Sequence, residues 1–114
     1  MTVMKKITPI ATRSGGNVFA DAGIPNATEH MLKARVVVVI MREIKRQQLN
    51  QKEAADMMGI KQPDVSRILR GDFAGFGLER LLRLVQKLGS DVDIKISRPR
   101  NDKYHEGRLV MHAH

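Results

Sequence analysis

The sequence predicts a mainly α-helical fold, a compact helical bundle that contains a helix-turn-helix and ends in one C-terminal β-strand. Three observations lead to this prediction. Residues 51–70 contain two short helical patterns that meet at Gly59. Longer amphipathic patterns lie on both sides of them, at 27–47 and 78–88. The period of the apolar residues then changes to two at 92–96, which is typical of a half-buried strand.

Residues 51–70, QKEAADMMGIKQPDVSRILR, have the spacing of a DNA-binding helix-turn-helix, in which two helices cross at a steep angle. A small side chain at Ala55 lets the second helix approach, and Gly59 suits a left-handed turn that other residues disfavour. Val65 and Ile68, three residues apart, turn one face of the second helix to the core. The polar residues of that helix then face outward: Gln62, Asp64, Ser66, Arg67 and Arg70.

The first helix is expected at about 27–47, although its VVVVI run is β-prone. An apolar residue falls at every fourth position, which is one face of a helix. Further apolar residues widen this face, so the helix should be buried on much of its circumference. The stripe consists of Leu32, Val36, Ile40 and Ile44, widened by Val37 and Met41.

The second helix is expected at 51–58. Asn50 precedes it and is a favourable N-cap, because its side chain can accept a hydrogen bond from the first turn. Met57 and Met58, at the end of this helix, are expected to fill the core.

The third helix is expected at 62–70, with Pro63 in its first turn, where proline is tolerated, and Gly71 as its stop. The fourth is expected at 78–88, where apolar residues recur at helical spacing, and Gly89 ends it. The loop between these helices should bury its two aromatic residues, Phe73 and Phe76.

Val92, Ile94 and Ile96 alternate with polar residues and form the predicted strand. An unpaired strand exposes its backbone groups, so this one needs a partner. Residues 3–7 and 109–111 of the same chain are two candidates. We favour a third, the same strand of a second subunit, because helix-turn-helix proteins commonly bind two-fold sites as dimers. The three apolar residues are therefore the predicted dimerisation residues.

The positive charge of the chain favours an anionic partner. The net charge is +8 and the isoelectric point is about 10.3. Residues 33–70 contain nine basic and four acidic side chains, so +5 of this charge surrounds the suspected motif. A solvated basic face would explain the charge alone, but together with the helix-turn-helix spacing it indicates nucleic acid.

Composition excludes several other classes of protein. There is no cysteine, which rules out disulfides and thiolate metal sites. No apolar run approaches the roughly 20 residues of a membrane span, and the longest, at 36–41, is too short for a signal-peptide core, so we expect a cytoplasmic protein. The histidines form no HExxH pattern and the serines lack a triad context, so neither an enzyme nor a metal or cofactor is expected. The expected domain covers 23–97, between a partly flexible arm at 1–22 and a polar tail at 98–114.

Residues 16–96 resemble the Xre/Cro-type helix-turn-helix regulators and, more narrowly, their HigA-like antitoxin subgroup. The resemblance is carried by GNVFADAGIPNA, by NQKEAADMMGIKQPDVSRILRG, and by LERLLRLVQKLG with the strand after it. It implies a homodimer on a palindromic operator in double-stranded DNA, repression of the protein's own operon, and a RelE-like ribonuclease toxin as a candidate partner. The chain departs from the subgroup at Gly77, where a serine usually caps the fourth helix.

The resemblance also implies which residues contact DNA. The glutamines that match Gln51 and Gln62 contact a phosphate and an adenine edge, and a glutamine amide has the donor and acceptor that adenine requires. Ser66 and Arg67 follow one turn later. Arg67 has two open roles, a bidentate contact with guanine or a phosphate contact that only positions the protein.

Three charged residues complete the predicted DNA-binding set. Asp64 is an acid on a helix that faces DNA, where it would either accept a hydrogen bond from cytosine or complement the positive helix N-terminus, the second being favoured. Lys61 and Arg70 are expected to meet phosphates, and plain surface charge is the competing explanation.

The rival hypothesis is a protein-interaction module whose main role is to bind and inhibit a toxin, with DNA binding secondary. The segments outside the DNA-binding motif, residues 1–24 and the tail, would serve it. The two roles can coexist, and they differ in whether a protected operator exists and in which residues the inhibition requires.

Overall fold

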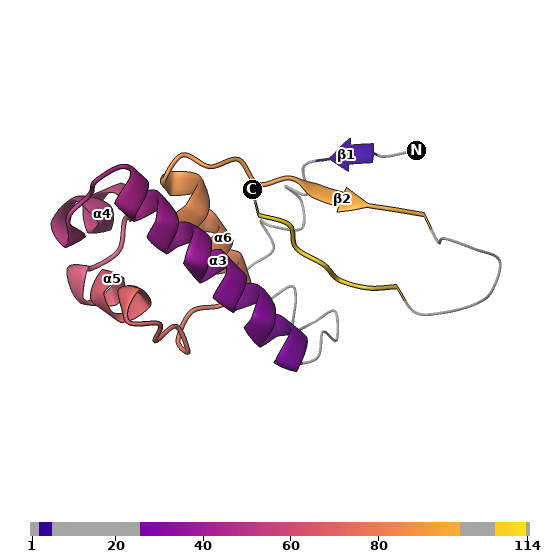
Figure 1. Ribbon diagram of the computed structural model, residues 1–114, viewed down its shortest axis with the longest axis horizontal. Coiled ribbons are helices and arrows are strands. Elements are labelled where there is room, and N and C mark those ends of the chain that lie inside the picture. The colour runs from indigo at the N-terminus through magenta and orange to yellow at the C-terminus, as the bar shows by residue number, and fades with distance from the viewer. Residues whose placement is uncertain (1–2, 6–25, 99–106, 114) are drawn as a thin grey trace.

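The computed structural model describes residues 3–5, 26–98 and 107–113 (Figure 1). The long helix α3 runs beside α6, and α4 and α5 lie together at one end of α3 (Figure 1). The mainly helical fold with its helix-turn-helix is confirmed, and each predicted helix boundary lies within one residue of the observed one. The elements are β1 (Val3–Lys5), α3 (Asn26–Arg46), α4 (Gln51–Met58), α5 (Gln62–Leu69), α6 (Leu78–Lys87) and β2 (Ile94–Ile96).

The valine-rich segment of α3 is helical because the tertiary structure buries it. Val36 and Val37 are 2% and 3% exposed, whereas Val38 is 60% exposed on the opposite side of the helix. Burial of β-branched side chains against α6 outweighs their modest intrinsic disadvantage in a helix. The predicted stripe is confirmed, since all of its members are buried: Leu32, Val36, Ile40 and Ile44.

The hydrophobic core is formed by residues of the four helices and by one aromatic residue of the loop between α5 and α6. Phe76, between α5 and α6, is 2% exposed, while Phe73 is partly buried against the same core. In the described part of the chain, no polar or charged residue is buried. The remaining fully buried side chains come from α3, α4, α5, α6 and the end of α6: Ile40, Met58, Ile68, Leu78, Leu81, Leu88, Val36 and Val65.

The turn between α4 and α5 has the predicted geometry. Gly59 adopts a left-handed conformation, with φ of 70°, and its N–H donates to the carbonyl of Ala55. Ala55 is 5% exposed, and Val65 and Ile68 are fully buried. The helix crossing that the sequence predicted is therefore confirmed in its small residue, its turn and its apolar face.

The start of α4 is capped more fully than expected. The Asn50 side chain accepts a hydrogen bond from the Glu53 N–H at 2.7 Å, and the Glu53 carboxylate accepts one from the Asn50 N–H at 2.9 Å. This reciprocal pair is a capping box. At the other end of α4 the prediction is half right, because Met58 is 1% exposed but Met57 is 44% exposed.

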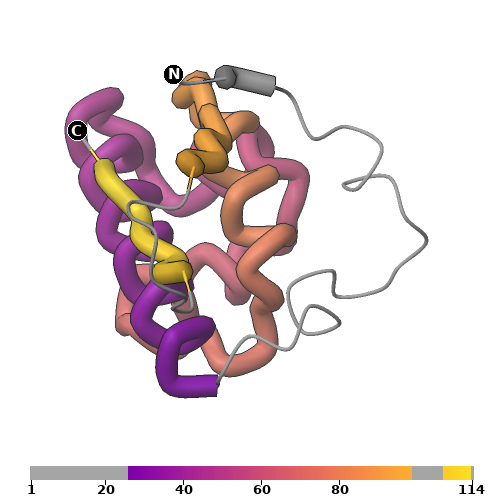
Figure 2. Tube along the Cα trace, turned by 90° about the vertical axis from the view of Figure 1, so that its right-hand side faces the viewer, coloured from indigo at the N-terminus to yellow at the C-terminus, as the bar shows by residue number. Residues whose placement is uncertain are grey.

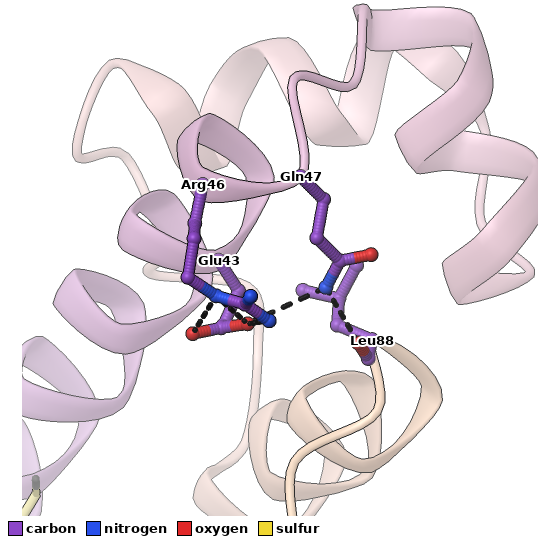
Figure 3. Close-up of polar contacts among 4 residues, drawn as sticks. All are labelled: Glu43, Arg46, Gln47 and Leu88. Atoms are coloured by element: carbon purple, nitrogen blue, oxygen red, sulfur yellow. Dashed lines mark hydrogen bonds and ion pairs between the residues drawn. The ribbon is translucent and has the colours of Figure 1, made fainter.

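A group of polar contacts joins the end of α3 to the end of α6 (Figure 3). Gln47 Nε2 donates to the Leu88 carbonyl at 2.8 Å, and Arg46 donates to Glu43 with a shortest distance of 2.7 Å. Hydrogen bonding from Arg46 holds the pKa of the Glu43 carboxyl below its ordinary value of 4.5. These contacts hold the C-terminal ends of the two helices together.

Strand β2 is shorter than the predicted 92–96 and pairs within its own chain. It forms an antiparallel two-stranded sheet with β1, in the register Val3 opposite Ile96 and Lys5 opposite Ile94. Residues 3–7 were one of the open candidates, whereas the partner we favoured was a second subunit. Of the predicted dimerisation residues, Val92 packs on the core of its own chain, and Ile94 and Ile96 are 38% and 75% exposed.

The last described segment, 107–113, lies beside α3 (Figure 2). Arg35 Nη1 donates to the Met111 carbonyl at 3.4 Å, and the Met111 side chain packs on the core. The predicted tail is thus polar only in part. Of the predicted arm at 1–22, only Val3–Lys5 belongs to the described residues, and residues 99–106 of the tail lie outside them.

Candidate nucleic-acid interface

Three polar side chains gather where the N-terminal ends of α4 and α5 meet. Gln51 is the first residue of α4 and Gln62 the first of α5, and both are exposed. Together with Pro63 and Ser66 they line an open depression of about 350 Å³. The structure therefore brings together Gln51, Gln62 and Ser66, which lie up to 15 positions apart in the sequence.

A polar row continues from this depression along α5. Gln62, Ser66 and Arg70 are four residues apart and therefore share one face of the helix. Arg70 Nη1 donates to Ser66 Oγ at 2.7 Å, which holds the guanidinium along that face. Lys61, the N-cap of α5, is exposed and makes no capping side-chain bond. The two basic residues thus lie at opposite ends of the row.

Arg67 occupies a different place from the rest of the predicted set. Its Nη1 is 3.6 Å from Asp64 Oδ1, and its Nε is 3.4 Å from Asp72 Oδ2 in the loop after α5. Its guanidinium carbon lies 5.6 Å from the centroid of the Phe76 ring, and the side chain is 37% exposed. Arg67 does not line the depression with the glutamines.

Asp64 lies in the first turn of α5, the position where an acid complements the helix dipole. Its ion pair with Arg67, one turn further along, was not foreseen. Because this pair offsets the carboxylate, the surface of α5 keeps an excess of positive charge from its two ends. The arrangement suits an anionic polymer in spite of the acid.

Three residues around Arg67 were not predicted from the sequence: Asp72, Phe76 in contact with a cation, and Arg80. Arg80 lies over the Phe76 ring, with its guanidinium carbon 4.6 Å from the centroid. The only sequence signal was an acid five residues after an arginine, across the glycine that ends the helix. Two such residues meet only if the loop folds back on the helix. The periodicity of the sequence does not predict that fold of the loop.

The described part of the chain offers no grouping of three or more metal-ligating side chains. Nor does any helix within it combine the length and the apolar character that crossing a bilayer requires.

Comparison with known proteins agrees with this geometry. A helix-turn-helix domain family model matches residues 18–97. A solved structure of a protein assigned to the XRE family of transcriptional regulators is similar over 78% of this chain and 99% of that one, with 34% identity and a TM-score of 0.70. No curated protein matches. The chain therefore belongs to the helix-turn-helix family of XRE type and is a DNA-binding transcriptional regulator.

Proposed function

We propose that this regulator binds a two-fold-symmetric operator as a homodimer and represses its own operon in the cytoplasm. The observation that supports the proposal is the gathering of Gln51, Gln62 and Ser66 around one open depression at the start of α5. These side chains have the mixed donors and acceptors that base edges and phosphates require. Among the four residues that line the depression, only Pro63 has an apolar side chain, so amide and hydroxyl groups are available to a ligand there.

Each residue has a distinct role in this proposal. Gln62, at the first position of α5, bonds bidentately to an adenine in the major groove, and Gln51 holds a phosphate beside it. Ser66 follows Gln62 on the same face and contacts the next base or phosphate. Lys61 and Arg70, at the two ends of α5, meet phosphates and contribute the non-specific, salt-dependent part of the affinity.

Footprinting on the DNA upstream of the gene tests the proposal. We expect a protected site with two-fold symmetry and half-sites about one helical turn apart. Gln62→Ala should lower affinity for that site by about 1–3 kcal/mol and relax the preference at one base pair in each half-site. Gln86→Ala, at an exposed glutamine of α6, is the matched control and should leave the affinity unchanged. Absence of any protected symmetric site would refute the repressor proposal.

A second candidate function, toxin inhibition, is favoured by a separate observation on α3. Met31 and Val38, seven residues apart on one side of the helix, are each 60% exposed. Exposed apolar side chains on a surface outside α4 and α5 suit a protein partner better than DNA. In this proposal the chain also neutralises a RelE-like ribonuclease encoded beside it.

Co-expression with such a neighbouring toxin tests the second candidate. Growth should be restored by the full chain and by Gln62→Ala, because inhibition does not require the DNA-facing side chains. Replacing both Met31 and Val38 by serine should abolish the rescue, because the two exposed apolar side chains of α3 are then lost. If Gln62→Ala fails to protect cells while remaining folded, the two functions are not separable in the way proposed.

A further inference from the structure

Arg67 is held by contacts from three directions within its own chain. Asp64, one turn back on α5, lies 3.6 Å from Nη1, and Asp72, in the loop after the helix, lies 3.4 Å from Nε. The guanidinium lies 5.6 Å from the centre of the Phe76 ring. A side-chain carbon placed on Gly75 would be 3.4 Å from Nη2, so the loop backbone passes closely beside the arginine. A bidentate contact with a base needs two neighbouring guanidinium nitrogens, so it would compete with at least one of these ion pairs.

These contacts join α5 to the loop at 71–77. The Asp72 N–H donates to the Arg67 carbonyl at 2.9 Å. Arg67 and Asp72 are therefore joined twice, by this main-chain hydrogen bond and by the ion pair of their side chains. Phe76 is 2% exposed and anchors the far part of the loop in the core, next to the start of α6. The arginine therefore bridges the helix that carries Gln62 and Ser66 and the loop that leads to the next helix.

The geometry points to Arg67 as a positioning residue that fixes the loop at 71–77 against α5, rather than a residue that reads bases. This inference rests on the proposed operator binding by Gln51, Gln62 and Ser66, and it deepens it. Arg80, in the first turn of α6, then lies in a constant place relative to α5, with its guanidinium carbon 4.6 Å from the Phe76 ring centre. Gln51 and Gln62 then provide the specificity for the DNA sequence. Arg67 sets the angle at which α5 and the loop meet the duplex.

Asp72→Asn distinguishes this positioning role from direct base readout, because the two predict opposite changes in the affinity for operator DNA. Removing a negative charge from a DNA-facing loop should raise affinity for any DNA if Arg67 is merely freed to bind it. If Arg67 positions the loop through Asp72, affinity for the footprinted operator should instead fall about two- to fivefold, the effect of losing one partly exposed ion pair. Affinity for a mixed-sequence duplex of the same length should rise or stay constant.

Asp56→Asn is the matched control. Asp56 also pairs with a cation, Lys52 at 3.8 Å, but both residues lie on α4, so the pair joins no two elements. The substitution makes the same change in net charge and should not lower operator affinity. An operator affinity that rises equally in Asp72→Asn and Asp56→Asn would overturn the positioning role.

A measurement without DNA keeps this inference distinct from the proposed operator binding. Amide hydrogen exchange of the free protein should be faster at residues 72–77 in Arg67→Ala and Asp72→Asn than in the unchanged chain, and unchanged there in Asp56→Asn. If no operator is found but this exchange pattern holds, the proposed function fails while the loop connection stands. If residues 72–77 exchange at the same rate in all four proteins, Arg67 does not position the loop.

Discussion

At the scale of single residues, the ends of the helices depend on one backbone conformation. After α5 and α6 the chain turns through Gly71 and Gly89, with φ of 80° and 104°, and the following N–H reaches back five residues to a helix carbonyl. The same kind of bond ends α3, where the Leu49 N–H donates to the Ile44 carbonyl at 3.0 Å. There the left-handed position is filled by Gln48, with φ of 56°. This motif normally selects glycine, because a side chain is disfavoured in that conformation.

Gln48→Gly should therefore stabilise the protein. Relief of the left-handed backbone outweighs the extra entropy of glycine in the unfolded chain, and we expect a gain of about 0.5–1 kcal/mol in the free energy of unfolding. Gly89→Ala is the opposite change at an equivalent position and should lose about 1 kcal/mol. Among the described residues other than its chain neighbours, no atom lies within 4 Å of the added carbon, so only the backbone is strained. Urea denaturation measures both. A loss on Gln48→Gly would show that its side chain does more than occupy the turn.

At the scale of elements, α3 and α6 are held by apolar packing along their length and by polar contacts at one end (Figure 3). The last carbonyls of a helix have no hydrogen-bond partner within the helix. At the C-terminus of α6, the Gln47 side chain donates a hydrogen bond to one of them, the carbonyl of Leu88. Glu43 accepts from Arg46 and, at 3.4 Å, from Gln47. Since Glu43 thereby orients the residue that reaches α6, its charge affects how the two helices meet.

The lowered pKa of Glu43 gives this contact a pH dependence. A carboxyl whose pKa is lower in the folded than in the unfolded protein contributes stability above its ordinary pKa of 4.5 and loses it as the pH falls through the folded value. Glu43→Gln should therefore be less stable than the unchanged protein at neutral pH, and the difference should shrink below pH 4.5. Thermal melting between pH 7 and 3 measures this. Arg46→Gln should reduce the same pH dependence, because Arg46 is the largest cause of the lowered pKa. A melting temperature difference between Glu43→Gln and the unchanged protein that stays constant from pH 7 to 3 would contradict the assignment.

At the scale of the whole molecule, segments distant in the sequence complete a core that the four helices begin. Met111 packs on this core from the C-terminal segment, and Val92 packs on it from the chain before β2. Strand β1, near the other end of the chain, pairs with β2. The helix-turn-helix is thus part of a larger unit whose stability depends on residues outside the DNA-binding motif.

Met111→Ala should test this dependence. The side chain is partly buried, so we expect a loss of about 1 kcal/mol in the free energy of unfolding, well below the 2–5 kcal/mol of a fully buried methionine. Val110→Ala, at a neighbouring residue that is 54% exposed, is the control and should change the stability by less than about 0.5 kcal/mol. Equal effects of the two substitutions would mean that the segment does not dock through Met111.

The sequence by itself determined the helices, the turn at Gly59 and the buried faces, because these depend on neighbours within one or two turns. Its spacing also placed Gln62, Asp64, Ser66, Arg67 and Arg70 on the outer face of one helix, and the family resemblance added Gln51. The structure gathers Gln51, Gln62 and Ser66 around one depression. Whether they contact DNA stays a prediction. Only the tertiary structure decided the contacts of Arg67 with Asp72 and Phe76, the pairing of β1 with β2, and the docking of Met111. Each of these joins segments through a loop or across the core, where sequence periodicity carries no information about which residues meet.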